Sequence, residues 1–356
     1  MRFFRHEEWG ALQTFIRAHT HDRYILADKR YFDWQFTPQV TDAADTAAPS
    51  VLVLEINGTI RGYLGIITLP MNYYNTDVRG ACLANLMTDT ALRNRGVGVD
   101  FIARAQDAGY DLVYTTGYLP PLTPIYRHLG WQTDLLLRRF LFIIDANKTS
   151  TLAGVPVSES CHEKKAVCRT YICEEQFAIP DGIDALWMRV KEKYPITVIR
   201  SRAYLTWRYA HNPFLKYRFV TVRTGGVIEA YAVVRIEHAG DYTIGRIIDF
   251  IATDASERSL LAAVTNLCKR SGAHLIDFFF TGNFHEQSLL DAGFVEDTYE
   301  PYARIPIRFQ PLDRTIMHIN CAFRIMSPHP QVGMRMNSND WYITKGDGDQ
   351  DRGNPR

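Results

Sequence analysis

A glycine-containing turn between two regular elements has the residue types of an anion-binding site. The turn reads Arg93-Asn94-Arg95-Gly96-Val97-Gly98, and it lies between a predicted strand, Cys82 to Asp89, and a predicted helix, Val99 to Ala108. Glycines allow a tight turn that brings backbone N–H groups close to an anion, and the following helix adds the positive end of its dipole. We therefore expect a pyrophosphate at this turn. A plain helix N-terminus after a glycine turn is the alternative.

A second segment downstream carries a tyrosine on a short predicted helix. Tyr110 to Gly117 is an apolar run closed by a turn, which predicts a buried strand. The segment Pro124-Ile125-Tyr126-Arg127-His128-Leu129-Gly130-Trp131 then predicts a helix, because proline suits a first helical turn and glycine suits the residue just past the end. For Tyr126 the structural alternative to a chemical role is a core tyrosine anchored by its hydroxyl.

The two segments together resemble the GNAT N-acyltransferase superfamily. Its acyl-CoA signature is similar to the RxxGxG spacing, which lacks both the Gly-Lys-Ser/Thr of a P-loop and the third glycine of a dinucleotide-binding turn. The Tyr-x-x-x-Gly-aromatic pattern at Tyr126 resembles the segment with which these enzymes close their fourth helix. The resemblance covers Val51 to about Phe142.

The resemblance implies roles for individual residues. Tyr126 would protonate the departing CoA thiolate. The strand before the turn would splay from its neighbour and leave backbone groups free to pair with the pantetheine amides, since an open strand edge inside a fold needs a partner. Acyl-CoA would be a co-substrate, with no permanently bound cofactor, and the expected binding positions are Met87, Thr88, Arg93, Arg95, Gly96, Val97, Gly98 and Val99.

Several landmarks recur in the second half of the chain in the same order. Their offset shrinks slowly from 173 to 163 residues. This pattern predicts a duplicated domain and an α+β fold of two tandem GNAT-like domains, each a mixed twisted sheet flanked by helices, with the active cleft between or beside them. We expect domains at 1–150 and 160–310 and an extension at 311–356. The recurring pairs are Trp34-Gln35-Phe36 with Trp207-Arg208-Tyr209, Gly58 with Gly226, Tyr63 with Tyr231, Thr88-Asp89 with Thr253-Asp254, Thr116-Gly117 with Thr281-Gly282, and Gly130-Trp131 with Gly293-Phe294.

The second copy differs from the first at the phosphate turn. Its matching segment, Ala255 to Ser259, has no glycine and adds a carboxylate at Glu257. A carboxylate there would repel a pyrophosphate, so we expect the second half to have lost CoA binding. It would either support the first half or supply a wall of the acceptor site between the domains.

Acyl transfer to an amine needs a neutral amine and a stabilised leaving group. Asn85 could polarise a water or hold the tetrahedral intermediate, although it cannot be a base. Asp249 lies in an apolar predicted strand, where a carboxylate is expected only if it is paired, with Arg246 as a possible partner, or used. His285 falls in a loop expected to face the cleft and is a candidate base.

The sequence constrains the identity of the acceptor least. Tandem GNAT proteins that this chain resembles include N-acyltransferases acting on nucleotide-linked amino sugars. Aromatic side chains could stack on a sugar or base, with Tyr73, Tyr74, Tyr118 and Trp341 as candidates, and arginines could meet a diphosphate. Three alternatives stay open: another amine such as a peptide N-terminus, a polycationic aminoglycoside, and a non-catalytic acyl-CoA-binding protein.

Composition is that of an ordinary globular protein. The 356 residues are 46% hydrophobic and 22% charged, with a net charge of +1. No basic excess indicates nucleic acid, no apolar run reaches membrane length and no secretory signal begins the chain, so we expect a cytoplasmic protein without nucleic-acid or membrane partners. A zinc cluster at Cys161, His162, Cys168 and Cys173 is disfavoured by its irregular spacing, and we expect no metal. Oligomeric state stays open.

Two segments are predicted to lack regular secondary structure. The stretch from Ala146 to Glu159 predicts the inter-domain linker, because polar residues and Gly154 break the apolar pattern. The C-terminal part, with Gly346-Asp347-Gly348-Asp349-Gln350-Asp351, predicts a disordered, solvated tail. A calcium site there is disfavoured because the later bidentate glutamate is missing.

Overall fold

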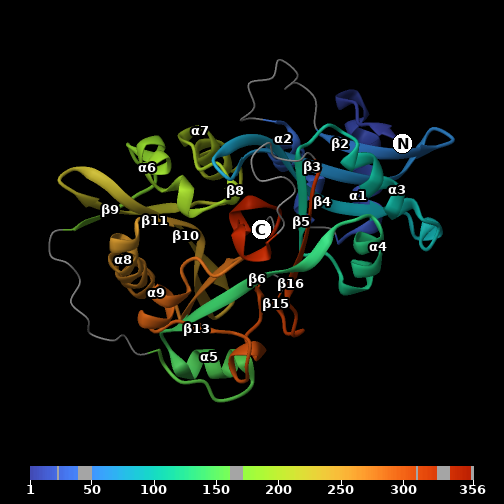
Figure 1. Cartoon of the computed structure of the whole chain (residues 1–356). Helices are drawn as coiled ribbons and strands as arrows, with labels where there is room; N and C mark the ends of the chain where they lie inside the picture. The colour runs from blue at the N-terminus through green and yellow to red at the C-terminus, as the bar shows by residue number, and fades with distance from the viewer. Residues whose placement is uncertain (22–23, 39–49, 161–170, 310–311, 327–336, 354–356) are drawn as a thin grey trace.

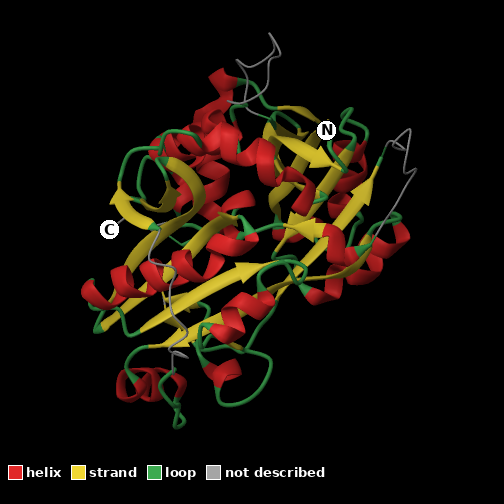
Figure 2. Cartoon of the chain, turned by 60° about the vertical axis from the view of Figure 1, so that its left-hand side comes forward, coloured by secondary structure: helices red, strands yellow, loops and turns green. Residues whose placement is uncertain are grey.

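The computed structural model describes residues 1–21, 24–38, 50–160, 171–309, 312–326 and 337–353. Fifteen strands of this part of the chain form one mixed sheet, with most of the helices around it (Figure 2). The predicted α+β class is confirmed. Cys161, His162 and Cys168 lie outside the described residues. No helix among those residues has the length and apolar character needed to cross a membrane.

The two halves of the chain have the same order of elements. In each, three antiparallel strands lead to a helix, a strand parallel to the third, a short helix and a further strand (Figure 1). The first half has β2 (Val51–Ile56), β3 (Thr59–Tyr73), β4 (Thr76–Thr88), α3 (Val97–Gln106), β5 (Leu112–Thr116), α4 (Thr123–His128) and β6 (Gln132–Ile143). The second has β9 (Arg218–Thr224), β10 (Val227–Ala239), β11 (Tyr242–Ala252), α8 (Glu257–Arg270), β12 (Leu275–Phe280), α9 (Glu286–Asp291) and β13 (Val295–Glu296).

A reciprocal tryptophan pair joins the halves. Trp34, in α2 (Lys29–Phe36), donates from Nε1 to the backbone oxygen of Trp207, in η6 (Thr206–Ala210), at 2.8 Å. Trp207 donates in the same way to the oxygen of Trp34, also at 2.8 Å. Both rings are buried. Such a self-complementary contact is typical of two copies related by a two-fold axis, and these are the tryptophans that the sequence repeat pairs.

Strands are shared across the domain limits expected from the sequence. The first part of β6 pairs with β16 (Ile319–Ile325), whereas residues 138–143 pair with β12 and residues 140–141 also pair with β13. Because β16 lies between β5 and β6, a strand from the C-terminal extension completes the sheet of the first half. Residues 311–356 are therefore not a separate appendage.

The expected linker contains a helix. Asp145 caps α5 (Ala146–Ala153) by accepting a hydrogen bond from the backbone N–H of Lys148, and Gly154 ends it in the left-handed conformation with φ 72°. Asparagine, aspartate or serine before a helix and glycine after it are standard cap residues. The polar residues that break the apolar pattern are thus the caps and outer face of a short helix.

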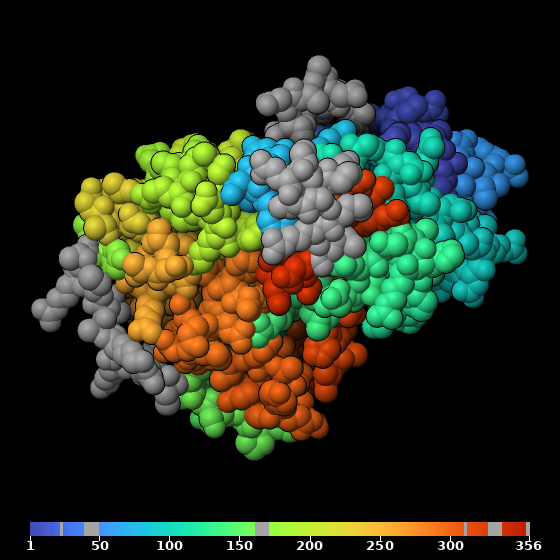
Figure 3. Space-filling view, viewed as in Figure 1, coloured from blue at the N-terminus to red at the C-terminus, as the bar shows by residue number. Residues whose placement is uncertain are grey.

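The prediction of a disordered, solvated C-terminal tail is wrong. Residues 341–349 are buried between the two halves, where the red C-terminal atoms lie in Figure 3. Two aspartates of the tail pair with cations distant in sequence, Asp347 with Arg200 at 2.7 Å and Asp351 with Arg235 at 2.6 Å, and Asp349 pairs locally with Arg352 at 3.4 Å. Buried charges need partners of this kind, and the tail's composition does not show them.

A substitution at Gly346 tests how tightly the C-terminal tail is packed. A Cβ at Gly346 would overlap the hydroxyl of Tyr209 and lie 3.3 Å from the backbone oxygen of Ile248. We expect Gly346→Ala to lower the free energy of unfolding by about 1–3 kcal/mol, as overpacking does, measured by urea denaturation. Gly10→Ala is the control, because Gly10 is in α1 (Trp9–His19) with no atom within 4 Å of its Cβ position. An unchanged midpoint for Gly346→Ala would contradict the packing described.

Candidate active site

Strands β4 and β5 separate halfway along β4. They pair in parallel only from Gly80 to Leu83, against residues 112–115. A bulge follows, at which Asn85 has φ 58°, and Met87 and Thr88 then pair with β3 on the other side. The edge of β4 that faces β5 is therefore open from Asn85 onward. This is the splay expected of an acyl-CoA site, and the open backbone groups could pair with amides of a ligand.

Helix α3 presents free backbone donors beside this open edge. It begins at Val97, two residues earlier than predicted, after Gly96 with φ 79°. Among the described residues, no backbone oxygen accepts from the N–H groups of Val97, Gly98 or Val99. A Cβ at Gly98 would lie 3.5 Å from a methyl group of Leu86 on β4, so the helix N-terminus and the splayed strand are neighbours. Free N–H groups and the helix dipole make this end a potential anion site.

A cavity of about 250 Å³ opens where the strands part. Its lining joins the splayed strand, α4 and the C-terminal tail, and it includes Asn85, Thr116, Tyr118, Tyr126, Tyr24, Arg308, Asp349, Gln350 and Arg352. The structure thus brings together three of the predicted site residues, Asn85, Tyr118 and Tyr126. The tail residues in this lining were not predicted.

Asn85 has a free amide donor. Its Oδ1 accepts from Arg352 Nη1 at 2.9 Å and from the Tyr24 hydroxyl at 3.1 Å. A guanidinium only donates, so this contact fixes which end of the amide is the oxygen. Nδ2 is buried and has no hydrogen-bond partner within the described part of the chain. An orphaned buried donor is costly unless a ligand uses it, and an N–H donor suits a developing oxyanion.

Tyr126 is held in an apolar setting. It is 4% exposed, and its ring lies 4.9 Å from Tyr118 and 5.1 Å from Trp131 between centroids. Burial raises the pKa of the Tyr126 hydroxyl above its ordinary value of 10.0. The phenol therefore keeps its proton at neutral pH and can donate it. Its position in the cavity is compatible with either a proton donor or a core tyrosine.

Asp349 is a site residue that sequence reasoning missed. Among the described residues that line this cavity it is the one carboxylate, so it is the side chain there best suited to accept a proton from an amine. It is 4% exposed. The Asp-Gly repeat that contains it was interpreted as solvated. No local pattern places Asp349 in the same cavity as Tyr126, because the two residues are more than 200 positions apart in the chain.

Asp249 and His285 lie elsewhere. Asp249 is fully buried and bonds Arg200 at 3.1 Å and the Tyr231 hydroxyl at 3.0 Å, so Arg200 and not Arg246 is its partner. Burial raises its pKa to about 6. His285 is 1% exposed, with Nδ1 2.9 Å from Glu257 Oε1. Neither lines the two cavities described here.

Two of the predicted stacking residues are also away from the cavity. Trp341, in β17 (Trp341–Tyr342), is 0% exposed and packs 4.3 Å from the ring of Phe323. Tyr73 is 3% exposed, and its ring lies 5.0 Å from that of Tyr74. Stacking on a ligand needs an accessible ring face, which these two rings lack in this conformation. Arg93 and Arg95 are exposed beside the turn, and Tyr118 is the predicted stacking residue that lines the cavity.

The corresponding slot of the second half is filled by the protein itself. Strands β11 and β12 pair in parallel only from Ile244 to Ile247. Beyond that point the tail takes the open edges: the N–H of Thr281 donates to the oxygen of Ile343 at 2.9 Å, and the Tyr342 hydroxyl donates to the oxygen of Phe250 at 2.5 Å. The second half keeps the splay, and residues 342–346 occupy the place that a pantetheine arm would need. Glu257, at its helix start, forms an ion pair with Lys193 and a hydrogen bond with His285.

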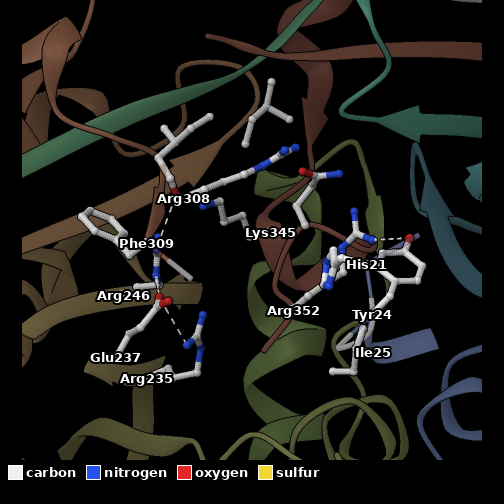
Figure 4. Close-up of a pocket in the computed structure, with 13 residues that line it drawn as sticks. His21, Tyr24, Ile25, Arg235, Glu237, Arg246, Arg308, Phe309, Lys345 and Arg352 are labelled. Atoms are coloured by element: carbon white, nitrogen blue, oxygen red, sulfur yellow. Dashed lines mark hydrogen bonds and ion pairs between the residues drawn. The ribbon is translucent and has the colours of Figure 1, made fainter. Parts of the chain in front are cut away.

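A second cavity of about 240 Å³ adjoins the first and shares Tyr24, Arg308, Gln350 and Arg352 with it. Figure 4 shows its walls: Tyr24, His21 and Arg352 lie on one side, and Arg235, Glu237, Arg246 and Phe309 lie on the other, with Lys345 between them. It therefore lies between the two halves. In the described chain no cluster of three or more metal-ligating side chains occurs.

Comparison with known proteins identifies the fold. No family model and no curated protein matches the sequence. Among solved structures, a GCN5-related N-acetyltransferase from Anabaena variabilis ATCC 29413 is similar, with TM-score 0.56 and 12% identity over 91% of this chain and 71% of that one. A conserved protein of unknown function from Enterococcus faecalis V583, described as a probable N-acyltransferase, has TM-score 0.59 and 10% identity over the same shares. At this identity the likeness shows a GNAT-like fold.

Proposed function

We propose that this protein is an acyl-CoA-dependent N-acyltransferase whose acceptor is the amine of a nucleotide-linked amino sugar. The observation that carries the proposal is the cavity at the β4–β5 splay, in which a free buried amide donor, Asn85 Nδ2, lies with a protonated tyrosine and a carboxylate. A donor for the oxyanion, an acid for the thiolate and a base for the amine are the three groups that direct transfer needs. We propose the cytoplasm as its location.

Each group at the splay and in the cavity has a separate role in the proposed reaction. The N–H groups of Val97, Gly98 and Val99 bind the CoA pyrophosphate, and the open edge from Asn85 to Thr88 pairs with pantetheine. Asn85 Nδ2 donates to the thioester oxygen. Asp349 accepts a proton as the amine nitrogen forms its bond to the acyl carbon, and Tyr126 gives its proton to sulfur as the carbon–sulfur bond breaks.

The lining of the adjoining cavity favours an anionic acceptor over a polycationic one. It carries five cationic side chains, Arg235, Arg246, Arg308, Lys345 and Arg352, and Glu237 as its carboxylate among the described residues. An aminoglycoside would be repelled there, whereas a diphosphate would be attracted. Tyr118, whose ring borders the catalytic cavity, is available to pack on a sugar ring.

An acceptor panel tests the proposal. With acetyl-CoA, we expect thiol release and an N-acetylated product, identified by mass spectrometry, with nucleotide-linked amino sugars. We expect much slower turnover with a peptide amine or an aminoglycoside. Faster turnover with an aminoglycoside would refute the acceptor class, and the absence of product with every amine, although CoA binds, would favour a non-catalytic acyl-CoA-binding protein.

A further inference from the structure

We propose that the cavity between the halves, lined by Lys345 and Arg308, is an oxyanion-binding subsite that holds a phosphate or carboxylate group of the acceptor. The inference rests on the proposed function, because it assigns to one part of that acceptor a separate place beside the catalytic cavity. It is carried by the positions and pairing of the cations, and not by their number.

Three of the five cations around this cavity are neutralised by the protein. Arg235 pairs with Asp351 at 2.6 Å, and Arg246 pairs with Glu237 and with Asp277, the latter at 2.8 Å. Arg352 lies 3.4 Å from Asp349 and donates to Asn85. The carboxylates largely cancel the charges of these three arginines. The three arginines alone therefore do not predict an anion site.

Lys345 is different, because it is a buried cation without a polar partner. It is 5% exposed, it lines the cavity, and no described residue forms a hydrogen bond or an ion pair with its ammonium. Its Nζ lies 3.6 Å from the centre of the Phe279 ring, which compensates only part of the lost hydration. In Figure 4 its side chain lies between the two walls. A buried ammonium in this state is a strong reason to expect an anionic ligand.

Arg308 supplies the second unneutralised charge. It lies in β14 (Arg308–Phe309) at the rim shared by the two cavities. It faces Asp313 across the β14–β15 pair and interacts with it electrostatically, but no described carboxylate is within ion-pair distance of its guanidinium. A guanidinium has the fork geometry that matches phosphate and carboxylate oxygens. When Lys345 is protonated, it and Arg308 place two cationic groups at this cavity, which suits one oxyanion.

The two cavities share part of their lining, so one acceptor molecule can occupy both. Because Tyr24, Arg308, Gln350 and Arg352 line both spaces, a ligand with its oxyanion against Lys345 can extend past this shared rim toward Asp349 and Asn85. The subsite would thus orient the acceptor amine, and Lys345 and Arg308 would be positioning residues that do not touch the reacting atoms.

Protonation of Lys345 should raise the affinity of this cavity for an oxyanion. Burial lowers the pKa of Lys345 to about 7, with Arg246 on β11 and Arg139 on β6 acting in the same direction and Asp277 on β12 and Asp351 in the tail opposing them. The ammonium is therefore only partly charged at neutral pH. A dianion needs the charged form, so its affinity should rise as the pH falls from about 8 to about 6. His21 also lines the cavity, so the pH dependence of the wild-type affinity is compared with that of a Lys345 variant.

The test is calorimetric titration of sulfate into the full-length protein saturated with CoA, at constant ionic strength set with chloride. Sulfate keeps its charge across this pH range, and a parallel titration with citrate distinguishes a phosphate-like from a carboxylate preference. We expect Lys345→Met and Arg308→Gln to weaken binding by roughly tenfold or more and Lys345→Met to flatten the pH dependence. CoA affinity should be unchanged.

Arg314→Gln is the matched control, because Arg314 is an exposed arginine nearby in sequence that lines neither cavity. Sulfate and citrate binding no stronger than chloride, or equal binding by wild type and both cavity variants, would overturn the inference. Arg308→Gln keeps the test decisive if Lys345→Met does not fold, because Arg308 is exposed. If CoA fails to bind, the proposed function fails instead, and the titration without CoA still tests the subsite.

Discussion

Gly98→Val should weaken CoA binding by roughly 100-fold or more while the fold persists. Gly98 is the second residue of α3, and its N–H is one of the free donors at that helix end. A branched side chain there would stand between the donors and a pyrophosphate, and the loss of two or more charge-assisted hydrogen bonds accounts for the magnitude. Its Cβ meets only a methyl group of Leu86, at 3.5 Å, so the substitution is compatible with the fold. The measurement is isothermal titration calorimetry.

Gly10→Val is the matched control for this variant. Gly10 is likewise the second residue of a helix, α1, and no atom lies within 4 Å of its Cβ position. Valine should therefore lower helix stability in both variants. Only Gly98→Val should also lose CoA affinity. Equal affinities of the two variants would show that the pyrophosphate binds somewhere else.

Tyr126→Phe should lower kcat by roughly 100-fold or more, with little change in CoA affinity. The substitution removes the hydroxyl and keeps the ring that packs between Tyr118 and Trp131. Turnover is measured by thiol release from acetyl-CoA with the best acceptor of the panel. The variant loses the donated proton and also the hydrogen bond between the hydroxyl and Thr115.

Tyr110→Phe separates a chemical from a structural effect. Tyr110 is also buried in this half, where its hydroxyl lies 2.9 Å from Thr68 Oγ1, and it lines neither cavity. We expect Tyr110→Phe to keep the parental kcat. If Tyr126→Phe also turns over at the parental rate, water or another group protonates the thiolate, and Tyr126 is a core residue.

Local sequence patterns predicted the features that depend on neighbouring residues. The helix after the glycine turn, the strand before it and the short helix with Tyr126 follow from turn, cap and periodicity signals within about ten residues, although the first of these helices begins at Val97 and not at the predicted Val99. The duplication was also visible, because Trp34 and Trp207 repeat in sequence and then bond to each other in space. The α+β class followed from this order of elements.

Features that depend on residues far apart in the chain could not be predicted from the sequence. The tail is buried because Asp347 and Asp351 pair with Arg200 and Arg235, more than 100 residues earlier, and an Asp-Gly repeat alone looks solvated. Arg246, three residues away, was the partner considered for Asp249 from the sequence, whereas the partner in the structure is Arg200, which lies outside β11. Asp349 and Lys345 join the cavities only because the chain returns between the halves at its end.

The most direct test of the account is a crystal structure of the full-length protein with acetyl-CoA. We predict one CoA per chain, with pyrophosphate oxygens about 3 Å from the N–H groups of Val97 to Val99, and the thioester oxygen at hydrogen-bond distance from Asn85 Nδ2. Residues 342–346 should still fill the slot of the second half. Acetyl-CoA bound between β11 and β12 in place of the tail, or bound with its thioester away from Asn85 and Tyr126, would contradict the account.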